Sequence, residues 1–213
     1  LLSSYHKMKV NLKVNWKEEC ERLFDDYPGA SDNSLVRQGW RWDDVIHLLI
    51  LPTYNESLEV LESCFQGLKD DGYPLQKMIV VFAVEGRAGS SGREKAKVIE
   101  QKYGSLFYRF LVTFHPDAIV GENKGKGSNQ AYAAQVVKKE IIDKEGIDYK
   151  KLLVSVFDID TVVEPGYFYC LTHKFLTTDS PYRASYQPVP MYHNNIWQAP
   201  FFARVAASSN TFW

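Results

Sequence analysis

Short apolar runs rich in β-branched and aromatic residues alternate with segments of helical periodicity from residue 45 onward. The runs predict strands at 45–51, 77–84, 107–114 and 152–157, with a weaker one at 183–188. The periodic segments predict helices at 56–68, 91–103, 129–144 and 166–176. Strands that alternate with helices favour a largely parallel sheet covered on both faces. The sequence therefore predicts the α/β class, with a Rossmann-like, mostly parallel sheet flanked by helices.

The first 44 residues lack this alternation. An amphipathic helical stretch at 16–24 is followed by a turn-rich segment at 27–39. We predict that residues 1–44 form a leader segment of helix plus loop, packed on the flank of one domain that comprises residues 45–213. The aromatic and basic cluster at 40–42 leaves a second possibility open, a position at a membrane interface.

The overall charge excludes a global electrostatic attraction to polyanions. Lys and Arg number 25 against 26 Asp and Glu, so the formal net charge is -1. We therefore expect no nucleic-acid partner. The apolar stretch 78–84 is too short to cross a bilayer, so we expect membrane contact only through regions outside this segment. The three cysteines, Cys20, Cys64 and Cys170, lack metal-ligand spacing and indicate buried thiols in a cytoplasmic, reducing environment.

Two carboxylates, Asp158 and Asp160, directly follow the apolar run 152–157. Side chains at positions i and i+2 of extended backbone point the same way, so both would meet just beyond the end of a strand. A hard divalent cation relieves the repulsion between them. Mg2+ or Mn2+ bound by one or two carboxylates keeps its other positions for water and substrate phosphates. The pair predicts a metal-diphosphate site, with a turn and a helix cap as the alternative.

The turn after the first strand also carries polar groups. Ligands of open α/β sheets bind beyond the carboxyl ends of the strands, where Pro52, Thr53, Tyr54 and Glu56 are expected. The backbone N-H groups and short side chains of this turn could face a nucleotide. Thr53 and Glu56 also have the spacing of a helix capping box, which explains both residues without a ligand.

Two further segments are expected at the same edge. Glu85 ends the second strand, where its carboxylate could accept a hydrogen bond from a base, or could simply end the strand in a turn. The loop at 87–93 could contact phosphate or be solvated. The loop at 121–129 places two lysines among three glycines ahead of a helix. Glycines let backbone approach an anion and lysines neutralise it, although the spacing is not that of a Walker A loop.

Three motifs in this order, Pro52-Thr53-Tyr54-Asn55-Glu56, the 124–129 loop and Asp158-Ile159-Asp160, resemble those of the family 2 glycosyltransferases with the GT-A fold. The resemblance covers residues 45–187. It implies nucleotide-sugar binding by Pro52, Thr53, Tyr54, Glu56, Glu85, Lys124, Gly127, Asn129 and Asp158. It implies metal binding by Asp160 with Asp158, and an acceptor side at Gln187 and Pro188.

The chain departs from the family pattern at two places. The family usually ends its second strand with aspartates against uracil, where this chain has Glu85. The family's general base is an acidic residue after the acceptor segment, and no acidic residue follows Asp179 here. We therefore expect the catalytic base to lie beyond Trp213 in a longer protein, and little or no transfer by this segment alone.

The resemblance implies a metal-dependent inverting glycosyltransferase that moves sugar from a nucleoside diphosphate, UDP in the first instance, to a hydroxyl of a carbohydrate or lipid-linked acceptor. Such an enzyme would act in polysaccharide biosynthesis on the cytoplasmic face of a membrane. Two alternatives stay open. A nucleotidyltransferase would carry a glycine-rich, basic loop after the first strand, which residues 51–56 lack. A non-catalytic nucleotide-sugar-binding or scaffold domain would need no base.

Overall fold

The computed structural model describes residues 2–24, 26–117, 119, 121–122 and 125–188 of the 213-residue chain. The chain divides into two compact units, one of which is Trp16–Tyr182. The other takes residues from both ends of the chain and includes helix α1 (Leu2–Asn11). Within the described part of the chain, no helix combines the length and apolarity needed to cross a membrane.

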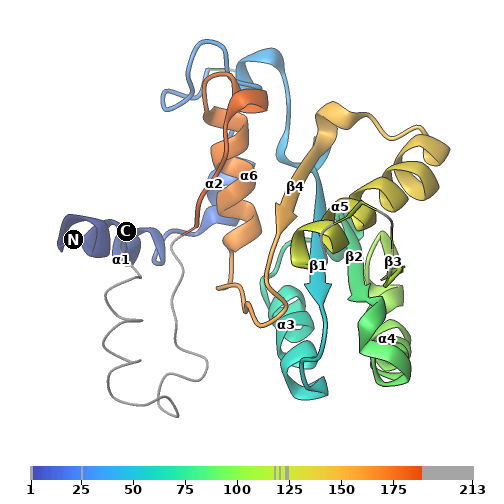
Figure 1. Ribbon diagram of the computed structural model, residues 1–213. Helices are drawn as coiled ribbons and strands as arrows, with labels where there is room; N and C mark the ends of the chain where they lie inside the picture. Colours follow the sequence, from blue (N-terminus) through green and yellow to red (C-terminus); the bar gives the residue numbers. More distant parts are fainter. Residues whose placement is uncertain (1, 25, 118, 120, 123–124, 189–213) are drawn as a thin grey trace. The chain divides into compact units, whose positions relative to one another are not determined.

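The unit Trp16–Tyr182 is built on a four-stranded parallel sheet (Figure 1). Its strands are β1 (Ile46–Thr53), β2 (Met78–Glu85), β3 (Arg109–His115) and β4 (Leu152–Val156). They lie in the order β3-β2-β1-β4, with every neighbouring pair parallel. The predicted α/β class and Rossmann-like parallel sheet are confirmed.

The two central strands explain why the sequence shows continuous apolar runs. All residues of β2, and all of β1 except Ile46, are buried because helices cover both faces of the sheet. The edge strand β4 alternates instead, with Leu153 and Ser155 buried and Val154 and Val156 exposed.

One face of the sheet carries α3 (Leu58–Asp70), α4 (Gly89–Tyr103) and α6 (Tyr167–Thr177). Aromatic side chains dominate this layer, and Phe65 contacts Phe82, Tyr103 and Phe107. Helix α2 (Trp16–Glu21) packs on α6, where the Cys20 thiol donates to the carbonyl of Tyr169 at 3.2 Å. A helix of the predicted leader therefore packs within the sheet-containing unit.

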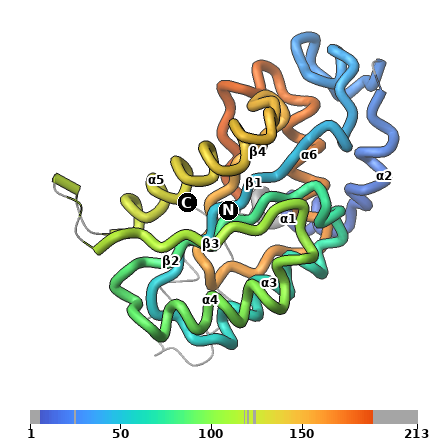
Figure 2. Tube along the Cα trace, turned by 90° about the vertical axis from the view of Figure 1, so that its right-hand side faces the viewer, coloured from blue at the N-terminus to red at the C-terminus, as the bar shows by residue number. Residues whose placement is uncertain are grey.

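The other face of the sheet is covered by α5 (Lys126–Val137), which continues as a π-helical turn at Lys138–Asp143. Figure 2 shows α5 on one side of the strands and α3 and α4 on the other. Ala133, Val137 and Ile141 contact the strand residues of this face, which are Leu48, Ile50, Ile79, Val81 and Ala83. The helix begins three residues before the predicted start at Asn129, so Lys126 belongs to its first turn.

The weak strand predicted at 183–188 is wrong. Pro181–Arg183 is a short 3-10 helix, and residues 184–188 form neither helix nor strand. Pro188 lacks the N-H that a sheet ladder needs, and Ser180 turns the chain with a φ of 49°. Gln187 and Pro188, the predicted acceptor-side residues, belong to the unit formed by the two chain ends.

The strand order places a topological switch point between β1 and β4. The chain leaves β1 to pair with β2 on one side, while β4 pairs with β1 on the other. Open α/β sheets bind ligands in the crevice at such a point, beyond the carboxyl ends of the strands. Thr53 and Glu85 are the last residues of β1 and β2, and Asp158 follows β4 by two residues.

Candidate functional site

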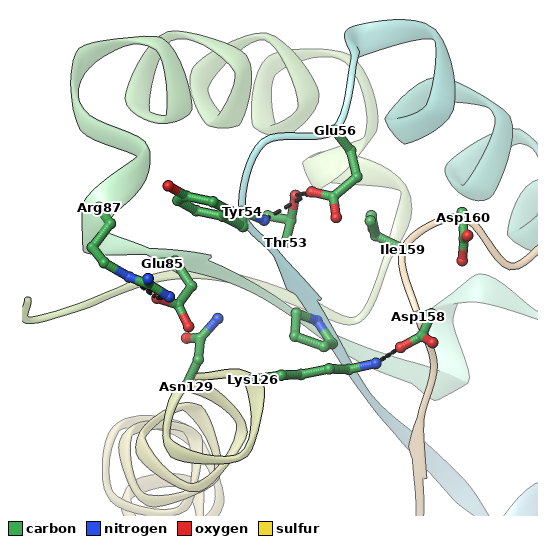
Figure 3. Close-up of a pocket in the computed structure, with 11 residues that line it drawn as sticks. Thr53, Tyr54, Glu56, Glu85, Arg87, Lys126, Asn129, Asp158, Ile159 and Asp160 are labelled. Atoms are coloured by element: carbon green, nitrogen blue, oxygen red, sulfur yellow. Dashed lines mark hydrogen bonds and ion pairs between the residues drawn. The ribbon is translucent and has the colours of Figure 1, made fainter. Parts of the chain in front are cut away.

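A pocket of about 370 Å³ lies at this carboxyl edge (Figure 3). Four separate segments of the chain line it: the turn after β1, the end of β2, the first turns of α5 and the turn after β4. Its lining residues are Pro52, Thr53, Tyr54, Glu56, Glu85, Arg87, Lys126, Asn129, Asp158, Ile159 and Asp160. The predicted residues of the 52–56 turn, Glu85, Asn129 and the two aspartates are thus brought together.

The remaining predicted residues are placed elsewhere. Gly127 lies in the first turn of α5 but does not line the pocket. Lys124 lies outside the described residues. Lys126, the other lysine of the glycine-rich segment, was not among the residues named for the nucleotide-sugar, and it lies in the pocket wall, in the first turn of α5.

The Glu56 side chain holds the turn after β1 in place through hydrogen bonds. The Thr53 hydroxyl donates to Glu56 Oε2 at 2.7 Å, and the Tyr54 N-H donates to the same oxygen at 2.8 Å. Burial alone would raise the pKa of Glu56, but these hydrogen bonds outweigh it and the pKa is lowered. Glu56 is therefore ionised near neutral pH and fixes the turn from within.

The capping-box alternative for Thr53 and Glu56 is wrong. Helix α3 begins at Leu58, and its cap is Ser57, whose hydroxyl accepts from the N-H of Val60 at 3.4 Å. The Lys95 ammonium of α4 also donates to the Glu56 carbonyl at 2.7 Å. The turn is thus anchored to α4 from outside, which leaves Thr53 and Tyr54 in the pocket wall.

Glu85 shares its carboxylate with Arg87 at the next strand end. Arg87 donates twice to Glu85 Oε2, from Nε at 3.1 Å and from a terminal nitrogen at 2.9 Å. The guanidinium also lies over the Tyr54 ring, 5.0 Å from its centroid. The hydrogen bonds and charge of Glu85 raise the pKa of Arg87. Tyr54, Arg87 and Glu85 therefore form one connected wall.

The backbone at Gly86 passes close to the end of β3. A Cβ at Gly86 would lie 2.2 Å from the backbone oxygen of His115 at the end of β3, closer than any real contact. The ends of β2 and β3 thus approach each other through a glycine. Backbone packing between the two strand ends therefore explains why position 86 is a glycine.

Asn129 brings a fully buried amide to the pocket. Its Nδ2 donates to the Ala83 carbonyl of β2 at 2.7 Å, which fixes the orientation of the amide because a carbonyl can only accept. Its Oδ1 is buried and has no hydrogen-bond partner among the described residues. Buried acceptors are normally satisfied, so this oxygen indicates a missing N-H or O-H donor.

Asp158 and Asp160 stand in a turn, not on the extended backbone that the sequence predicted. The Thr161 N-H donates to the Asp158 carbonyl at 2.8 Å and closes the turn. Ile159 between them is buried in the core, and Val162 packs where a Cβ at Gly67 would meet its Cγ1 at 2.8 Å. The turn is therefore anchored on α3, and both carboxylates still reach the pocket.

The two aspartates have different surroundings. Asp158 forms an ion pair with the Lys126 ammonium across the pocket (Figure 3). Asp160 lies near Cys64 of α3, since burial and the Asp160 carboxylate together raise the pKa of that thiol to about 12. Asp158 is thus paired with a lysine ammonium, and Asp160 lies on the α3 side of the pocket.

The donor set fits a hard cation that arrives with a ligand. In the described ranges no group of three or more His, Cys, Asp or Glu side chains could hold a metal ion. Asp158 and Asp160 supply carboxylate oxygens alone, which suit Mg2+ or Mn2+ better than zinc or copper. Such ions commonly take one or two protein carboxylates and complete their coordination with water and phosphate oxygens.

No family model, curated protein or solved structure matches this chain. The pocket lies at the switch point of a parallel sheet, and it holds ion pairs and a buried acceptor that has no hydrogen-bond partner among the described residues. Open α/β sheets bind ligands at such a point.

Proposed function

We propose that the pocket binds a nucleoside diphosphate sugar, in the first instance a UDP-sugar, together with Mg2+ or Mn2+. The chain would then be the donor-binding part of a metal-dependent inverting glycosyltransferase of GT-A type. One observation carries the proposal: Asp158 from the turn after β4 and Lys126 from α5 meet in a pocket at the switch point. That pairing offers both a carboxylate for a cation and an ammonium for a phosphate.

The walls of the pocket suit the nucleoside. Thr53 and Tyr54 present a turn held rigid by Glu56. Glu85 and Asn129 offer acceptor oxygens side by side on the β2 wall, because the Asn129 amide is fixed on Ala83, two residues before Glu85. Acceptors of this kind select N-H groups of a base or hydroxyl groups of ribose.

The side of the pocket formed by Lys126 of α5 and the turn after β4 suits the diphosphate. Lys126 stands in the first turn of α5, where backbone N-H groups and the helix dipole favour an anion. A divalent cation bound there would neutralise charge on the leaving diphosphate. Asp158 and Asp160 would hold that cation, and Lys126 would bind a phosphate oxygen.

Transfer also needs a base that removes the proton of the acceptor hydroxyl. Three carboxylates of the pocket already have partners: Glu56 bonds the 53–54 turn, Glu85 pairs with Arg87, and Asp158 pairs with Lys126. Glu56, Glu85 and Asp158 are therefore poorly placed to act as that base. The acceptor would be a carbohydrate or lipid-linked hydroxyl at the cytoplasmic face of a membrane.

Because Glu56, Glu85 and Asp158 already have partners, the pocket also suits a second candidate, a nucleotide-sugar-binding domain without catalysis. Such a domain would need the binding wall and the cation but no base. The two candidates predict the same ligand and differ only in whether the sugar is transferred. The nucleotidyltransferase alternative gains no support, because the turn after β1 lines the pocket without a glycine or a basic residue.

Calorimetric titration of UDP-glucose into the chain, with and without Mn2+, tests the proposal. We expect Mn2+ to tighten binding at least about tenfold and Asp160→Asn to abolish that gain. Asp179→Asn is the matched control, because Asp179 is an exposed carboxylate that does not line the pocket. Equal affinity with and without Mn2+, retained in Asp160→Asn, would contradict the metal role. Absence of binding to UDP-glucose and to GDP-mannose under all conditions would contradict the proposed function.

A further inference from the structure

Lys126 does more than contact the diphosphate. We propose that its ammonium occupies the cation position beside Asp158 in the ligand-free pocket, and transfers to the diphosphate when a divalent cation takes its place. Metal and nucleotide would then bind as a coupled pair, each weakly alone. This inference rests on the proposed function, because it assumes that the pocket takes a cation and a diphosphate.

A metal ion can readily replace Lys126 in its ion pair with Asp158. Lys126 extends across the pocket from the start of α5 to Asp158 (Figure 3). The two side chains are 50% and 60% exposed, so water and ions reach both. An exposed pair contributes little net free energy and is broken easily. The lysine stem has four rotatable carbons and carries a compact charge, so the ammonium can move several ångströms without a backbone change.

A divalent cation alone meets competition at this position. It must displace the Lys126 ammonium from Asp158, while Glu56 and Glu85 are already hydrogen-bonded to the 53–54 turn and to Arg87. The pocket offers the metal ion Asp158 and Asp160, and the described residues hold no larger group of metal ligands. Metal alone is therefore expected to bind weakly.

A diphosphate without a metal ion is repelled by the net negative charge of the pocket. The pocket wall contains the four carboxylates of Glu56, Glu85, Asp158 and Asp160 against the two cations of Arg87 and Lys126, which leaves two negative charges. A bare diphosphate is repelled by that excess. A divalent cation cancels it, and the diphosphate in turn gives Lys126 an anion. Each ligand removes the obstacle to the other, which is a coupling between the two binding events.

The coupling has a signature in the neutral variant Lys126→Met. Without the ammonium, Mn2+ alone no longer has a competitor, so its affinity should rise by about threefold to tenfold. The affinity for UDP at saturating Mn2+ should fall by about tenfold, because a charge-assisted contact is lost. A lysine with a purely structural role would shift both affinities in the same direction or neither.

Calorimetry measures both quantities on the 213-residue chain. Mn2+ is titrated alone, and then UDP and GDP are titrated separately at saturating Mn2+, for the parent chain, Lys126→Met and Lys126→Gln. Lys139→Met is the control, since it removes the same charge from the π-helical continuation of α5, where its side chain is 83% exposed. Circular dichroism checks that each variant is folded.

Higher affinity for Mn2+ alone in both Lys126 variants, with weaker nucleotide binding, supports the inference. Unchanged or lower affinity for Mn2+ in either folded variant overturns it, whatever the nucleotide does. If the Mn2+ affinity rises but neither UDP nor GDP binds to the parent chain, the competition at Asp158 stands and the proposed function fails. If nucleotide and metal bind the parent chain independently, the coupling is wrong while the proposed function survives.

Discussion

The pocket at the carboxyl edge and the interior around α6 both contain titratable side chains, in opposite settings. We call the α6 interior the group formed by His47, Asp71 and His173 with the α6 residues that they contact. Asp158 in the pocket is 60% exposed, whereas Asp71 is 4% exposed. The charged side chains of the pocket form ion pairs that water can reach. The titratable side chains of the α6 interior are instead buried away from water.

The titratable groups of the α6 interior have strongly shifted pKa values. Burial raises the pKa of Asp71 to about 6, although it accepts hydrogen bonds from the N-H groups of Tyr73 and Phe168. Burial lowers the pKa of His47 to about 3 and that of His173 to about 4. Shifted pKa values often mark binding sites, but here they mark helix–sheet packing. In this fold, paired and exposed charges identify the candidate site better than shifted ones do.

The largest expected effect concerns the backbone beneath the pocket. Gly86→Ala places a Cβ 2.2 Å from the His115 oxygen and should lower the free energy of unfolding by about 3 kcal/mol. Gly127→Ala is the control, because open space surrounds that position in α5 and alanine favours a helix by up to about 1 kcal/mol. Urea denaturation measures both. Equal stability of the two variants would contradict the close strand approach at Gly86.

The second prediction separates two aspartates by function. Asp158→Asn should weaken Mn2+-dependent UDP binding by more than about tenfold and change the unfolding free energy by less than about 0.5 kcal/mol, because the side chain is exposed. Calorimetry and urea denaturation measure the two quantities. A large loss of stability with intact binding would show that Asp158 supports the fold and does not bind the ligand.

The third prediction uses pH to probe the α6 interior. The pKa of His173 is lowered in the fold from 6.5 to about 4, so between those values the unfolded chain binds a proton that the folded chain does not. The stability due to neutral His173 is present above pH 6.5 and is lost as the pH falls toward 4, by about 3 kcal/mol.

His173→Phe should flatten this acid loss. Both ring nitrogens of His173 are buried without hydrogen-bond partners among the residues described, and Trp16 and Tyr27 pack against the ring edge-on. Phenylalanine keeps those contacts. Thermal unfolding between pH 4 and pH 7 measures the slope, and an unchanged slope would show that His173 is not the neutral, buried group described.

The smallest effect is expected at Asp71. Its pKa is raised from 3.8 to about 6, so the associated stability is present below pH 3.8 and is lost as the pH rises through 6. Asp71→Asn removes that loss, but it replaces one accepting oxygen with an NH2 group that faces a backbone N-H, so the two effects oppose each other. We expect its stability to differ from that of the parent by less than about 1 kcal/mol at pH 7.5 and to change less between pH 5 and pH 7.5, with unchanged UDP binding. Thermal unfolding at both pH values measures the change. An equal change in the two proteins would contradict the raised pKa of Asp71.

The sheet was predictable because its central strands are buried on both faces. Such strands carry continuous apolar runs, and the runs at 45–51 and 77–84 differ from β1 and β2 by one or two residues. The gathering of Thr53, Glu85 and Asp158 at one edge follows from parallel strands. The prediction at 183–188 failed because a turn at Ser180 precedes this segment and Pro188, at its end, lacks the N-H that a sheet ladder needs.

The details of the pocket depend on tertiary contacts that local sequence does not reveal. The place of Lys126 in the pocket wall depends on where α5 begins, and the turn at Asp158 depends on packing against α3. The pairing of Glu85 with Arg87 could have been anticipated, because opposite charges two residues apart flank Gly86 at a strand end. The unpartnered oxygen of Asn129 is visible only in three dimensions.

Paramagnetic broadening by Mn2+ tests the central claim most directly. Amide signals of the isotope-labelled chain are recorded with UDP, with Mn2+, and with both, since Mn2+ broadens only signals close to it. With both ligands present, the account predicts broadening of Tyr54, Asp158 and Asp160 and sharp signals for His47 and His173. Broadening centred on the α6 interior, or none at any residue of the pocket, would contradict it.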